Sequence, residues 1–407
     1  MHRPLICLAP LLACLPLQAK DLSVAAPKLA GMSEAKLVEV HAATQKLVDE
    51  KMVAGAVTLI ARKGKIVQFN TYGVRDLASG KPMERDTIFR IFSMSKSITT
   101  TAAMQLFEQG KFELDDPVSK FIPEFKEVRL QSGEKPEREI RIRDLMRHTS
   151  GLSYGFFGAA DYIAAGIGER DRPLADDVRA IAKLPLVCEP GTKFVYSVST
   201  DVLGRVVEVI SGQPLDQYFH EHLFEPLGMP DTGFFVPAEK APRLAALNGA
   251  REDDRQIRVI DAPATSDYLD KPKNLSGGGG LVATAGDYFR FCQMILNGGE
   301  LEGTRILKPE TVAMMTTNQI PDEAMPIGIG DTRIGIGFGL GFSVVTAKGD
   351  WDPAARVGEF GWGGAASTHY WMSPDDELLV ITMRQFMPYQ WTLERGLKGM
   401  IYDAIEN

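Results

Sequence analysis

The sequence is poor in the residues that build disulfide frameworks and metal centres. Only 4 of its 407 residues are cysteine and 6 are histidine. Cys188 and Cys292 lie outside the N-terminal apolar run, so at most one disulfide is expected in the folded part, and the sequence leaves its formation open. His220 and His222, two apart on a predicted helix, would point to different faces and could not share a metal ion. We therefore expect neither a metal nor another cofactor.

Positive charge is also scarce. The chain has 45 Lys and Arg against 53 Asp and Glu, a formal net charge of -8, and it contains no basic run. This balance argues against nucleic acid as a partner. The apolar share of 44% and the charged share of 24% are ordinary for a soluble globular protein. A chain of this length is too long for one compact core, so one large two-part fold or two domains are expected.

Long hydrophobic runs are missing except at the N-terminus. Residues 5–17 are almost uninterruptedly apolar, Arg3 precedes them, and Ala19 offers a small residue before the polar pair at 20–21. The run is too short to span a membrane and is typical of a signal peptide. We expect residues 1–19 to be removed and the protein to be exported, to the periplasm or the exterior. No stable membrane span is expected.

Residues 11–14 (Leu-Leu-Ala-Cys) offer an alternative to simple cleavage. They are similar to a lipoprotein box, in which Cys14 would carry a lipid anchor. Leu12 stands where such boxes usually have a small residue. Cleavage after Ala19 is therefore favoured, and the lipid anchor stays as the second possibility.

Strand patterns occur near both ends of the remaining chain. A helix is expected from Ser33, and residues 56–60 and 65–69 flank a Lys-Gly turn at 63–64 that predicts a β-hairpin. A long helix is expected over 93–107. Near the C-terminus we expect strands at 335–345, 360–372 and 378–383, and a closing helix at 397–405.

The middle of the chain is different, because short helical patterns separated by proline and glycine replace the strands. The clearest helix is 201–210, with Thr200 as the expected cap and Gly212 after its end. Residues 284–287 are typical of a capping box that begins another helix. Sheet at both ends and helices between them predict an α/β fold with an inserted helical domain. The expected domains are 20–112 together with 283–407 for the α/β part, and 113–282 for the helical part.

The first chemical signal is the tetrapeptide Ser-Met-Ser-Lys at 93–96. Positions i and i+3 of a helix share a face, so the ammonium of Lys96 can reach the hydroxyl of Ser93. A serine in the first turn of a helix also has a free backbone N–H that can face a developing oxyanion. A neighbouring base must take the serine proton before the hydroxyl becomes a good nucleophile, and a lysine can do so when its surroundings lower its pKa.

Two other serines compete with Ser93. Ser33 begins a second Ser-x-x-Lys, at 33–36, and is interpreted as a helix cap. Ser153 is the centre of a Gly-x-Ser-x-Gly pattern at 151–155, which as a nucleophile elbow would need a strand directly before it. The preceding residues 143–148 are charged and helix-like, so Ser153 is expected in a loop.

Five blocks together resemble the serine β-lactamase-related hydrolases, in the order usual for that group and across most of the mature chain. They are 93–96 (Ser-Met-Ser-Lys), 145–152 (Leu-Met-Arg-His-Thr-Ser-Gly-Leu), 189–197 (Glu-Pro-Gly-Thr-Lys-Phe-Val-Tyr-Ser), 226–229 (Pro-Leu-Gly-Met) and 276–281 (Ser-Gly-Gly-Gly-Gly-Leu). The group contains class C β-lactamases, D-Ala-D-Ala carboxypeptidases, family VIII carboxylesterases and some acyltransferases. The resemblance implies a β-lactamase/transpeptidase-like fold, an antiparallel sheet flanked by helices with a helical domain inserted.

The resemblance also implies the other site residues. Tyr196 corresponds to the tyrosine of the Tyr-x-Asn motif and would act with Ser93 and Lys96 as phenolate or proton relay. The sequence leaves open whether Lys96 or Tyr196 is the general base, since two such groups titrate together. Val198 stands where the motif has asparagine, so the amide that would contact a β-lactam side chain is missing.

A Trp-Gly-Gly at 362–364 takes the place of the Lys-Thr-Gly strand motif of β-lactamases, as in family VIII carboxylesterases. Trp362 offers an apolar wall instead of a cation for a substrate carboxylate, while Gly363 and Gly364 let the strand approach the substrate. The N–H of Ala365 would complete an oxyanion hole with that of Ser93. His369, just after this strand, is expected near the mouth of the site.

The resulting interpretation is a serine carboxylesterase that cleaves small or medium acyl esters through an acyl-enzyme on Ser93. The alternatives are a β-lactamase or D-amino-acid peptidase, an acyltransferase, and, outside the enzymes, a module that binds a cell-wall ligand. A binding module has no need for Ser93, Lys96 and Tyr196 together, which favours an enzyme.

Overall fold

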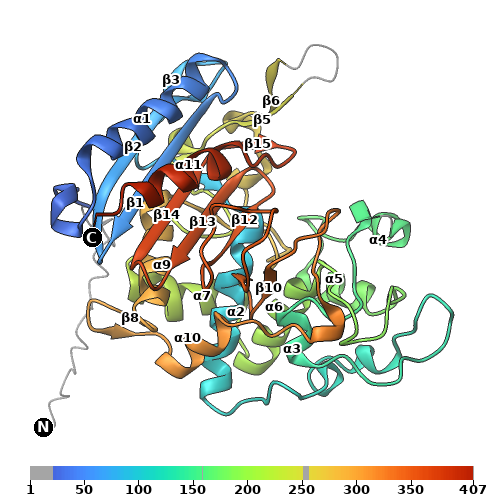
Figure 1. Cartoon of the computed structure of the whole chain (residues 1–407). Coiled ribbons are helices and arrows are strands. Elements are labelled where there is room, and N and C mark those ends of the chain that lie inside the picture. The colour runs from blue at the N-terminus through green and yellow to red at the C-terminus, as the bar shows by residue number, and fades with distance from the viewer. Residues whose placement is uncertain (1–21, 158, 251–255, 407) are drawn as a thin grey trace, which may run out of the picture.

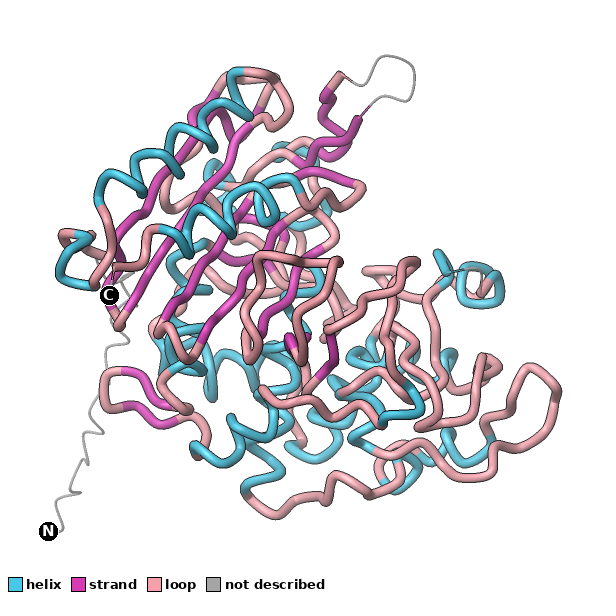
Figure 2. The backbone as a smooth tube through the Cα atoms, in the orientation of Figure 1, coloured by secondary structure: helices cyan, strands magenta, loops and turns pink. Residues whose placement is uncertain are grey.

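A computed structural model describes residues 22–157, 159–250 and 256–406 (Figures 1 and 2). The expected leader at 1–19, with Cys14, lies outside these described residues, so its fate stays a prediction. Within the described ranges, no helix is both long and apolar enough to cross a membrane.

One antiparallel sheet organises the molecule and takes its strands from both ends of the chain. In Figure 1 the blue N-terminal strands lie directly beside the red C-terminal ones. From edge to edge the strands are β10 (Ile336–Phe338), β11 (Ser343–Val345), β12 (Phe360–Gly364), β13 (Thr368–Ser373), β14 (Leu378–Met383), β1 (Gly55–Arg62), β2 (Lys65–Asp76) and β3 (Lys81–Pro82).

The predicted N-terminal hairpin is confirmed as β1 and β2. Lys63 and Gly64 connect the two strands with φ of 53° and 69°, the left-handed pair that suits the twist of a two-residue hairpin turn. In the middle of the sheet Leu59 is paired with Phe69 on β2 and with Ile381 on β14. The strand that begins the sheet is thus held by the strand that ends it.

Helices cover both faces of the sheet, which explains why β1 is buried along almost its whole length. On one face Ile60 packs in a cluster with side chains of α1 (Glu34–Asp49) and α11 (Thr392–Asp403). On the other face Leu59 packs in the main core with α2 (Ser95–Glu108) and α9 (Ala285–Leu296). Figure 2 shows these helices on opposite sides of the strands. The closing helix expected at 397–405 is present as α11. It begins at Thr392, five residues earlier than expected.

Helices predominate between the two groups of strands, although the boundaries at 113 and 282 stay a prediction. The hairpin of β5 (Leu247–Ala250) and β6 (Ile257–Asp261) was not expected in this helical part of the chain. It pairs with β15 (Phe386–Met387). The remaining elements are α3 (Ile142–Met146), α4 (Ala160–Ala164), α5 (Leu174–Ile181), α6 (Ser199–Ser211), α7 (Leu215–Phe219), α8 (Glu225–Leu227), α10 (Pro309–Met315), β4 (Phe89–Arg90), β5 (Leu247–Ala250), β6 (Ile257–Asp261), β7 (Val282–Ala283), β8 (Glu300–Leu301), β9 (Thr304–Arg305) and β15 (Phe386–Met387).

Two of the expected C-terminal strands are hairpins. The run at 335–345 divides into β10 and β11, which pair with each other, and Gly341 between them has φ of 84°. The run at 360–372 divides into β12 and β13, and Ser367 in their turn has φ of 62°. A positive φ ends an extended strand, so each apolar run turns back on itself.

The helix expected at 201–210 is α6. Thr200 is not its cap, because the helix already begins at Ser199. Gly212 follows its end in the left-handed conformation, as expected.

The start of α9 contains half of the expected capping box. Thr284 Oγ1 accepts a hydrogen bond from the Asp287 N–H at 3.1 Å. The Asp287 carboxylate does not return the bond but accepts from the N–H of Asp231 at 2.7 Å and from Thr232 Oγ1 at 2.9 Å. Burial and the nearby Asp231 carboxylate raise the pKa of Asp287 to about 7.

We predict that this carboxyl group makes stability fall as pH rises from about 4 to about 7. The folded protein keeps the Asp287 proton in this window, whereas the unfolded chain has lost it, so each pH unit costs at most about 1.4 kcal/mol. Asp287→Asn mimics the protonated form. Urea unfolding at pH 5, 6 and 7 gives the free energy of unfolding of both proteins. The value for the variant should increase relative to that of the wild type as pH rises. A difference that does not change with pH would contradict the assignment.

Candidate active site

The predicted nucleophile lies at the entrance to α2. Ser93 is in a 3-10 turn, η2 (Phe92–Met94), which leads directly into the helix. Phe92 before it has φ of 42°, a left-handed conformation that costs energy for a bulky side chain and is typical of functional sites. Lys96, one turn further on, donates to Ser93 Oγ at 3.2 Å. The i,i+3 relationship expected from the tetrapeptide is therefore present.

The ammonium of Lys96 is fully buried and has three hydrogen-bond acceptors. Besides Ser93, Nζ donates to Tyr154 Oη at 3.0 Å and to the carbonyl oxygen of Gly278 at 2.6 Å. It also lies 4.8 Å from the centre of the Tyr196 ring. A buried ammonium is tolerated only when each of its protons is used, and these contacts use all three.

A second set of bonds fixes the carbonyl that Lys96 contacts. Asp201, near the start of α6, accepts from Ser276 Oγ at 2.5 Å and from the Gly278 N–H at 3.0 Å. A side chain at Gly278 would approach Asp201 Oδ2 to 2.5 Å, so only glycine fits there. The glycine-rich block at 276–281 is thus a loop held by α6 that presents a carbonyl to Lys96.

These surroundings keep the Lys96 side chain charged. Burial, the largest single influence, lowers the pKa of Lys96, whereas the neighbouring Tyr154 and Tyr196 raise it. Asp201 acts in the same direction, and the net shift is upward. A lysine can act as the base when its surroundings lower its pKa, and here they raise it. Lys96 is therefore a cation at neutral pH.

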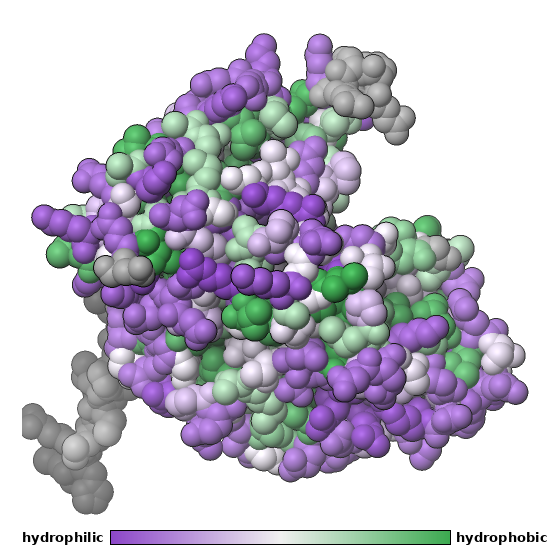
Figure 3. All heavy atoms as spheres, in the orientation of Figure 1, coloured by the Kyte–Doolittle hydropathy of each residue, from purple (hydrophilic) through white to green (hydrophobic). Residues whose placement is uncertain are grey.

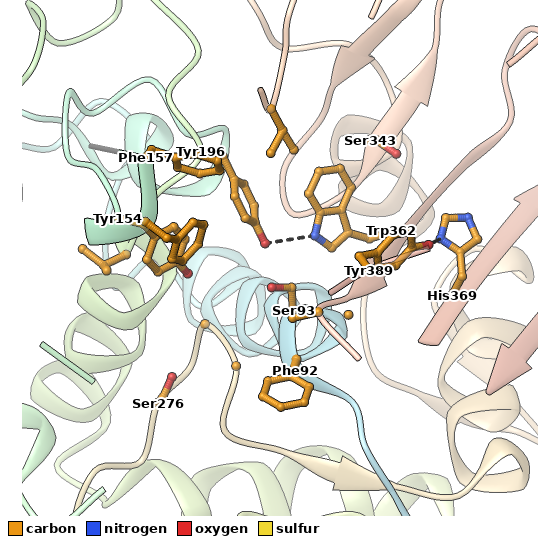
Figure 4. A pocket seen from close by; sticks show the side chains of 18 of the residues that line it. Phe92, Ser93, Tyr154, Phe157, Tyr196, Ser276, Ser343, Trp362, His369 and Tyr389 are labelled. Carbon is orange, nitrogen blue, oxygen red and sulfur yellow. Dashed lines mark hydrogen bonds between the residues drawn. The ribbon is translucent and has the colours of Figure 1, made fainter. Parts of the chain in front are cut away.

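Two tyrosines lie on the same side of Ser93, as Figure 4 shows. Tyr196 Oη accepts a hydrogen bond from Nε1 of Trp362 at 3.3 Å, and the rings of Tyr196 and Tyr154 are 5.6 Å apart. Burial raises the pKa of Tyr154, which keeps its phenol neutral despite the contact with Lys96. The structure therefore brings Ser93, Lys96 and Tyr196 together and adds Tyr154 to them.

The Trp-Gly-Gly segment forms β12 and passes close to the nucleophile. A side chain at Gly364 would come within 2.1 Å of the Ile91 carbonyl oxygen, two residues before Ser93. One at Gly363 would meet His369 and Tyr389 at under 3 Å, at 2.8 and 2.9 Å. Both glycines are thus required by close approach. Ala365, at the end of β12, lines the same cavity as Ser93, and so does Val198.

The cavity above Ser93 has a volume of about 1020 Å³ and lies between the sheet and the helical region, where Figure 3 shows the surface hollowed. One arm is apolar and opens to solvent: Phe156 and Ile163 are 71% and 68% exposed at its rim. The other part of the cavity, called here the sheet-side arm, is aromatic and charged, with Arg333, Trp351, Asp352, Trp391 and Lys398 in its lining. All four tryptophans of the chain line the cavity: Trp351, Trp362, Trp371 and Trp391.

The competing serines lie in other surroundings. Ser33 precedes α1, on the face of the sheet opposite α2, and its side chain makes no capping hydrogen bond. Ser153 is in a loop after α3, as expected, and its Oγ donates to the carbonyl of Tyr154 at 3.3 Å. No strand precedes it, so the nucleophile-elbow geometry is missing at this serine.

Sequence reasoning missed Tyr154 and Asp201. Tyr154 belongs to the pattern at 151–155 that was interpreted only through its serine, although it lies two residues after the block 145–152. Asp201 entered the sequence analysis only as the first residue of the helix expected at 201–210. His369 was expected near the site mouth and does line the cavity, with Nδ1 3.0 Å from Tyr389 Oη. Among the described residues no group of three or more His, Cys, Asp or Glu could hold a metal ion, and Cys188 and Cys292 are both free thiols.

Comparison with known proteins gives consistent results. The sequence profile described as Beta-lactamase matches residues 40–391. Protein Rv1367c of Mycobacterium tuberculosis (strain ATCC 25618 / H37Rv) is 37% identical over 368 residues, which cover 86% of this chain and 90% of that protein. Esterase EstB of Burkholderia gladioli is 34% identical over 345 residues, covering 79% and 83%.

A solved structure is similar over nearly the whole length of both chains. It is described as EstCE1, a hydrolase with promiscuous acyltransferase activity, and its TM-score is 0.78 at 29% identity. The superposition covers 91% of this chain and 99% of EstCE1.

We predict that a fluorophosphonate labels Ser93 and no other serine. Only an activated hydroxyl attacks the phosphorus, and Ser93 is the serine with a buried cation at hydrogen-bond distance and open space above it. Intact-mass and peptide mass spectrometry of the wild type, Ser93→Ala and Ser153→Ala provide the test. Labelling should vanish in Ser93→Ala and persist in Ser153→Ala, and the opposite pattern would overturn the assignment.

Proposed function

The chain belongs to the β-lactamase family of serine hydrolases, and from this premise we propose that it is a carboxylesterase with Ser93 as nucleophile. The resemblance inferred from the sequence is confirmed, as is the β-lactamase/transpeptidase-like fold. The carboxylesterase proposal depends above all on the position of Trp362. Its indole lies in the cavity beside Tyr196, where a lactam-cleaving relative would have a lysine. The relative named an esterase supports the same assignment.

Acylation would begin with attack of Ser93 Oγ on the ester carbonyl carbon. The serine proton passes to the Tyr196–Lys96 pair, and the N–H groups of Ser93 and Ala365 hold the resulting oxyanion. Collapse of the tetrahedral intermediate breaks the bond to the alcohol, which takes the proton from the pair. Water then attacks the acyl-enzyme, gives a proton to the same pair, and the acid leaves as Ser93 recovers its own proton.

The surroundings favour Tyr196 over Lys96 as the base in this scheme. The upward shift of the Lys96 pKa leaves no lone pair on Nζ at neutral pH. Tyr196 Oη, in contrast, accepts from the indole N–H of Trp362, and the Lys96 charge lies 4.8 Å from its ring. Tyr196 Oη thus accepts a hydrogen bond beside a cation, and its oxygen is the acceptor assigned to the serine proton in this scheme. Lys96 would then act as a fixed cation.

Acyl transfer to an alcohol is a second candidate, and the size of the cavity favours it. A volume of about 1020 Å³ is large for a short ester alone and leaves room for an acceptor beside the acyl group. EstCE1 is described as having promiscuous acyltransferase activity. Both reactions share the acyl-enzyme, and the second nucleophile, water or alcohol, decides between them.

We predict that Tyr196→Phe lowers kcat for p-nitrophenyl butyrate by about 10²- to 10³-fold, the usual effect of removing a general base. Tyr154→Phe removes one acceptor of the Lys96 ammonium and should cost roughly tenfold. Tyr218→Phe is the matched control, because its buried hydroxyl on α7 has no hydrogen-bond partner among the described residues. Steady-state kinetics decides: a larger loss in Tyr154→Phe than in Tyr196→Phe would transfer the role of base to Tyr154.

The substrate class gives a further prediction. kcat/KM for p-nitrophenyl butyrate should exceed that for nitrocefin by a hundredfold or more at one pH. The lactam carboxylate lies next to the scissile bond, where Trp362 offers no charge, and a buried carboxylate without its partner costs a few kcal/mol. Val198 also lacks the amide donor. Equal or higher efficiency on nitrocefin would replace the esterase proposal by a β-lactamase, with Ser93 and Lys96 in unchanged roles.

A further inference from the structure

A guanidinium lies in the sheet-side arm of the catalytic cavity. Arg333, in the segment before β10, lines the same cavity as Ser93, and only 8% of its side chain is exposed. Its charged group lies 4.4 Å from the ring of Trp351 and 5.6 Å from that of Trp391. The two rings hold the guanidinium in place through cation–π contact.

The hydrogen-bonding capacity of Arg333 is mostly unused. Its Nε donates to Asp331 Oδ1 at 3.0 Å. Neither terminal nitrogen has a hydrogen-bond partner among residues 22–157, 159–250 and 256–406. These two nitrogens carry four N–H groups in a planar fork, the arrangement that binds a carboxylate through two parallel bonds.

The other charges of this arm are satisfied by one another. Lys398 donates to Asp352 at 2.6 Å and also bonds to Glu359, which accepts in addition from Tyr402 at 2.6 Å. The remaining carboxylate, Asp331, accepts from Trp351 Nε1 at 2.7 Å as well as from Arg333. His369 is neutral at physiological pH, because burial and the charges of Lys398 and Arg333 hold its pKa well below the usual range. Arg333 is thus the cation of this arm that still has donors to offer.

Arg333 also interacts electrostatically with ionisable groups of the cavity. Burial lowers the pKa of Arg333, while the attraction of Asp331, Tyr389 and Tyr196 opposes that shift. Because Arg333, Tyr196 and Ser93 line one cavity, a substrate bound over Ser93 shares that space with the guanidinium.

We propose that Arg333 binds a carboxylate of the substrate, so that the preferred substrates are esters carrying a free carboxylate several bonds away from the scissile carbonyl. The proposal rests on the esterase function. It complements the loss of lysine from β12: Trp362 removes a cation beside the scissile bond, and Arg333 supplies one further along the sheet. A β-lactam carboxylate is fixed next to the scissile bond, whereas a chain of methylene groups lets an ester carboxylate reach the guanidinium.

Two pairs of esters test the proposal, each made of a free carboxylate and its methyl ester, and the wild type is compared with Arg333 variants on the same pair. p-Nitrophenyl hydrogen glutarate and its methyl ester place the carboxylate in the acyl group. 4-Acetoxybenzoate and its methyl ester place it in the alcohol. We expect the anionic member of one pair to have the higher kcat/KM, roughly tenfold to a hundredfold, and Arg333→Gln to abolish that ratio. Which pair responds identifies the group that occupies the sheet-side arm.

The ratio between anionic and neutral esters is the measured quantity, because loss of a charge near Tyr196 can slow both. Arg395→Gln is the matched control: its exposed guanidinium also lies over Trp351 and Trp391, at 5.0 and 5.3 Å, but does not line the cavity. It should leave the ratio unchanged, and Arg333→Lys should retain part of it.

Binding to the inactive Ser93→Ala variant makes the result independent of turnover. Calorimetry should give a lower Kd for the anionic than for the neutral ester, and Arg333→Gln in the same background should remove the difference. Equal Kd values for both members of both pairs, or an equal effect of Arg333→Gln on both members, would overturn the proposal. If neutral esters are hydrolysed and the anionic esters are not preferred, the esterase function is supported and only the carboxylate-binding role of Arg333 is contradicted.

Discussion

The site depends on one buried positive charge. An ammonium without water is costly unless all its protons are bonded, so the position of Lys96 dictates where its acceptors must be. The helix that carries Lys96 also carries Ser93, the loop of residues 276–281 brings a carbonyl, and Asp201 fixes that loop from another helix. Elements from three parts of the chain are thereby tied to a single atom, Nζ.

A buried cation also changes what the neighbouring groups can do. It is a fixed, desolvated charge, so the acylation proposed for Ser93 would need no reorganisation of it. Tyr196 and Ser93 both lie against it, so negative charge that develops on either oxygen is stabilised at once. The glycines of β12 complete this arrangement from the sheet side, because any side chain at Gly364 would push the strand away from η2.

The sequence was informative where the geometry is local. Ser93 and Lys96 are one helical turn apart, and Lys63-Gly64 makes a turn by its own backbone preference, so both could be predicted from spacing alone. Tyr196 and the Trp-Gly-Gly strand needed the likeness to a known family, since a hundred residues or more separate them from Ser93. No comparable block contained Tyr154, Asp201 or Arg333. Their roles follow from tertiary contacts, which spacing does not report.

The same distinction explains the errors of detail. Periodicity recognised the apolar runs at 335–345 and 360–372, but positive φ at Gly341 and at Ser367 accompanies a reversal of the chain inside each run. The sequence also left open whether Lys96 or Tyr196 is the base, because the acidic and phenolic neighbours that raise the pKa of Lys96 come from distant segments.

The placement of the tryptophans makes the protein its own optical probe. All four indoles border the catalytic cavity, one in contact with Tyr196 and two stacked against Arg333. Indole emission responds to the polarity and charge around the ring, and no tryptophan elsewhere in the chain contributes a constant background. Light emitted at the indole wavelength therefore originates only from the walls of the cavity. An unmodified sample can report the arrival of a colourless ligand there, with no dye attached to the protein.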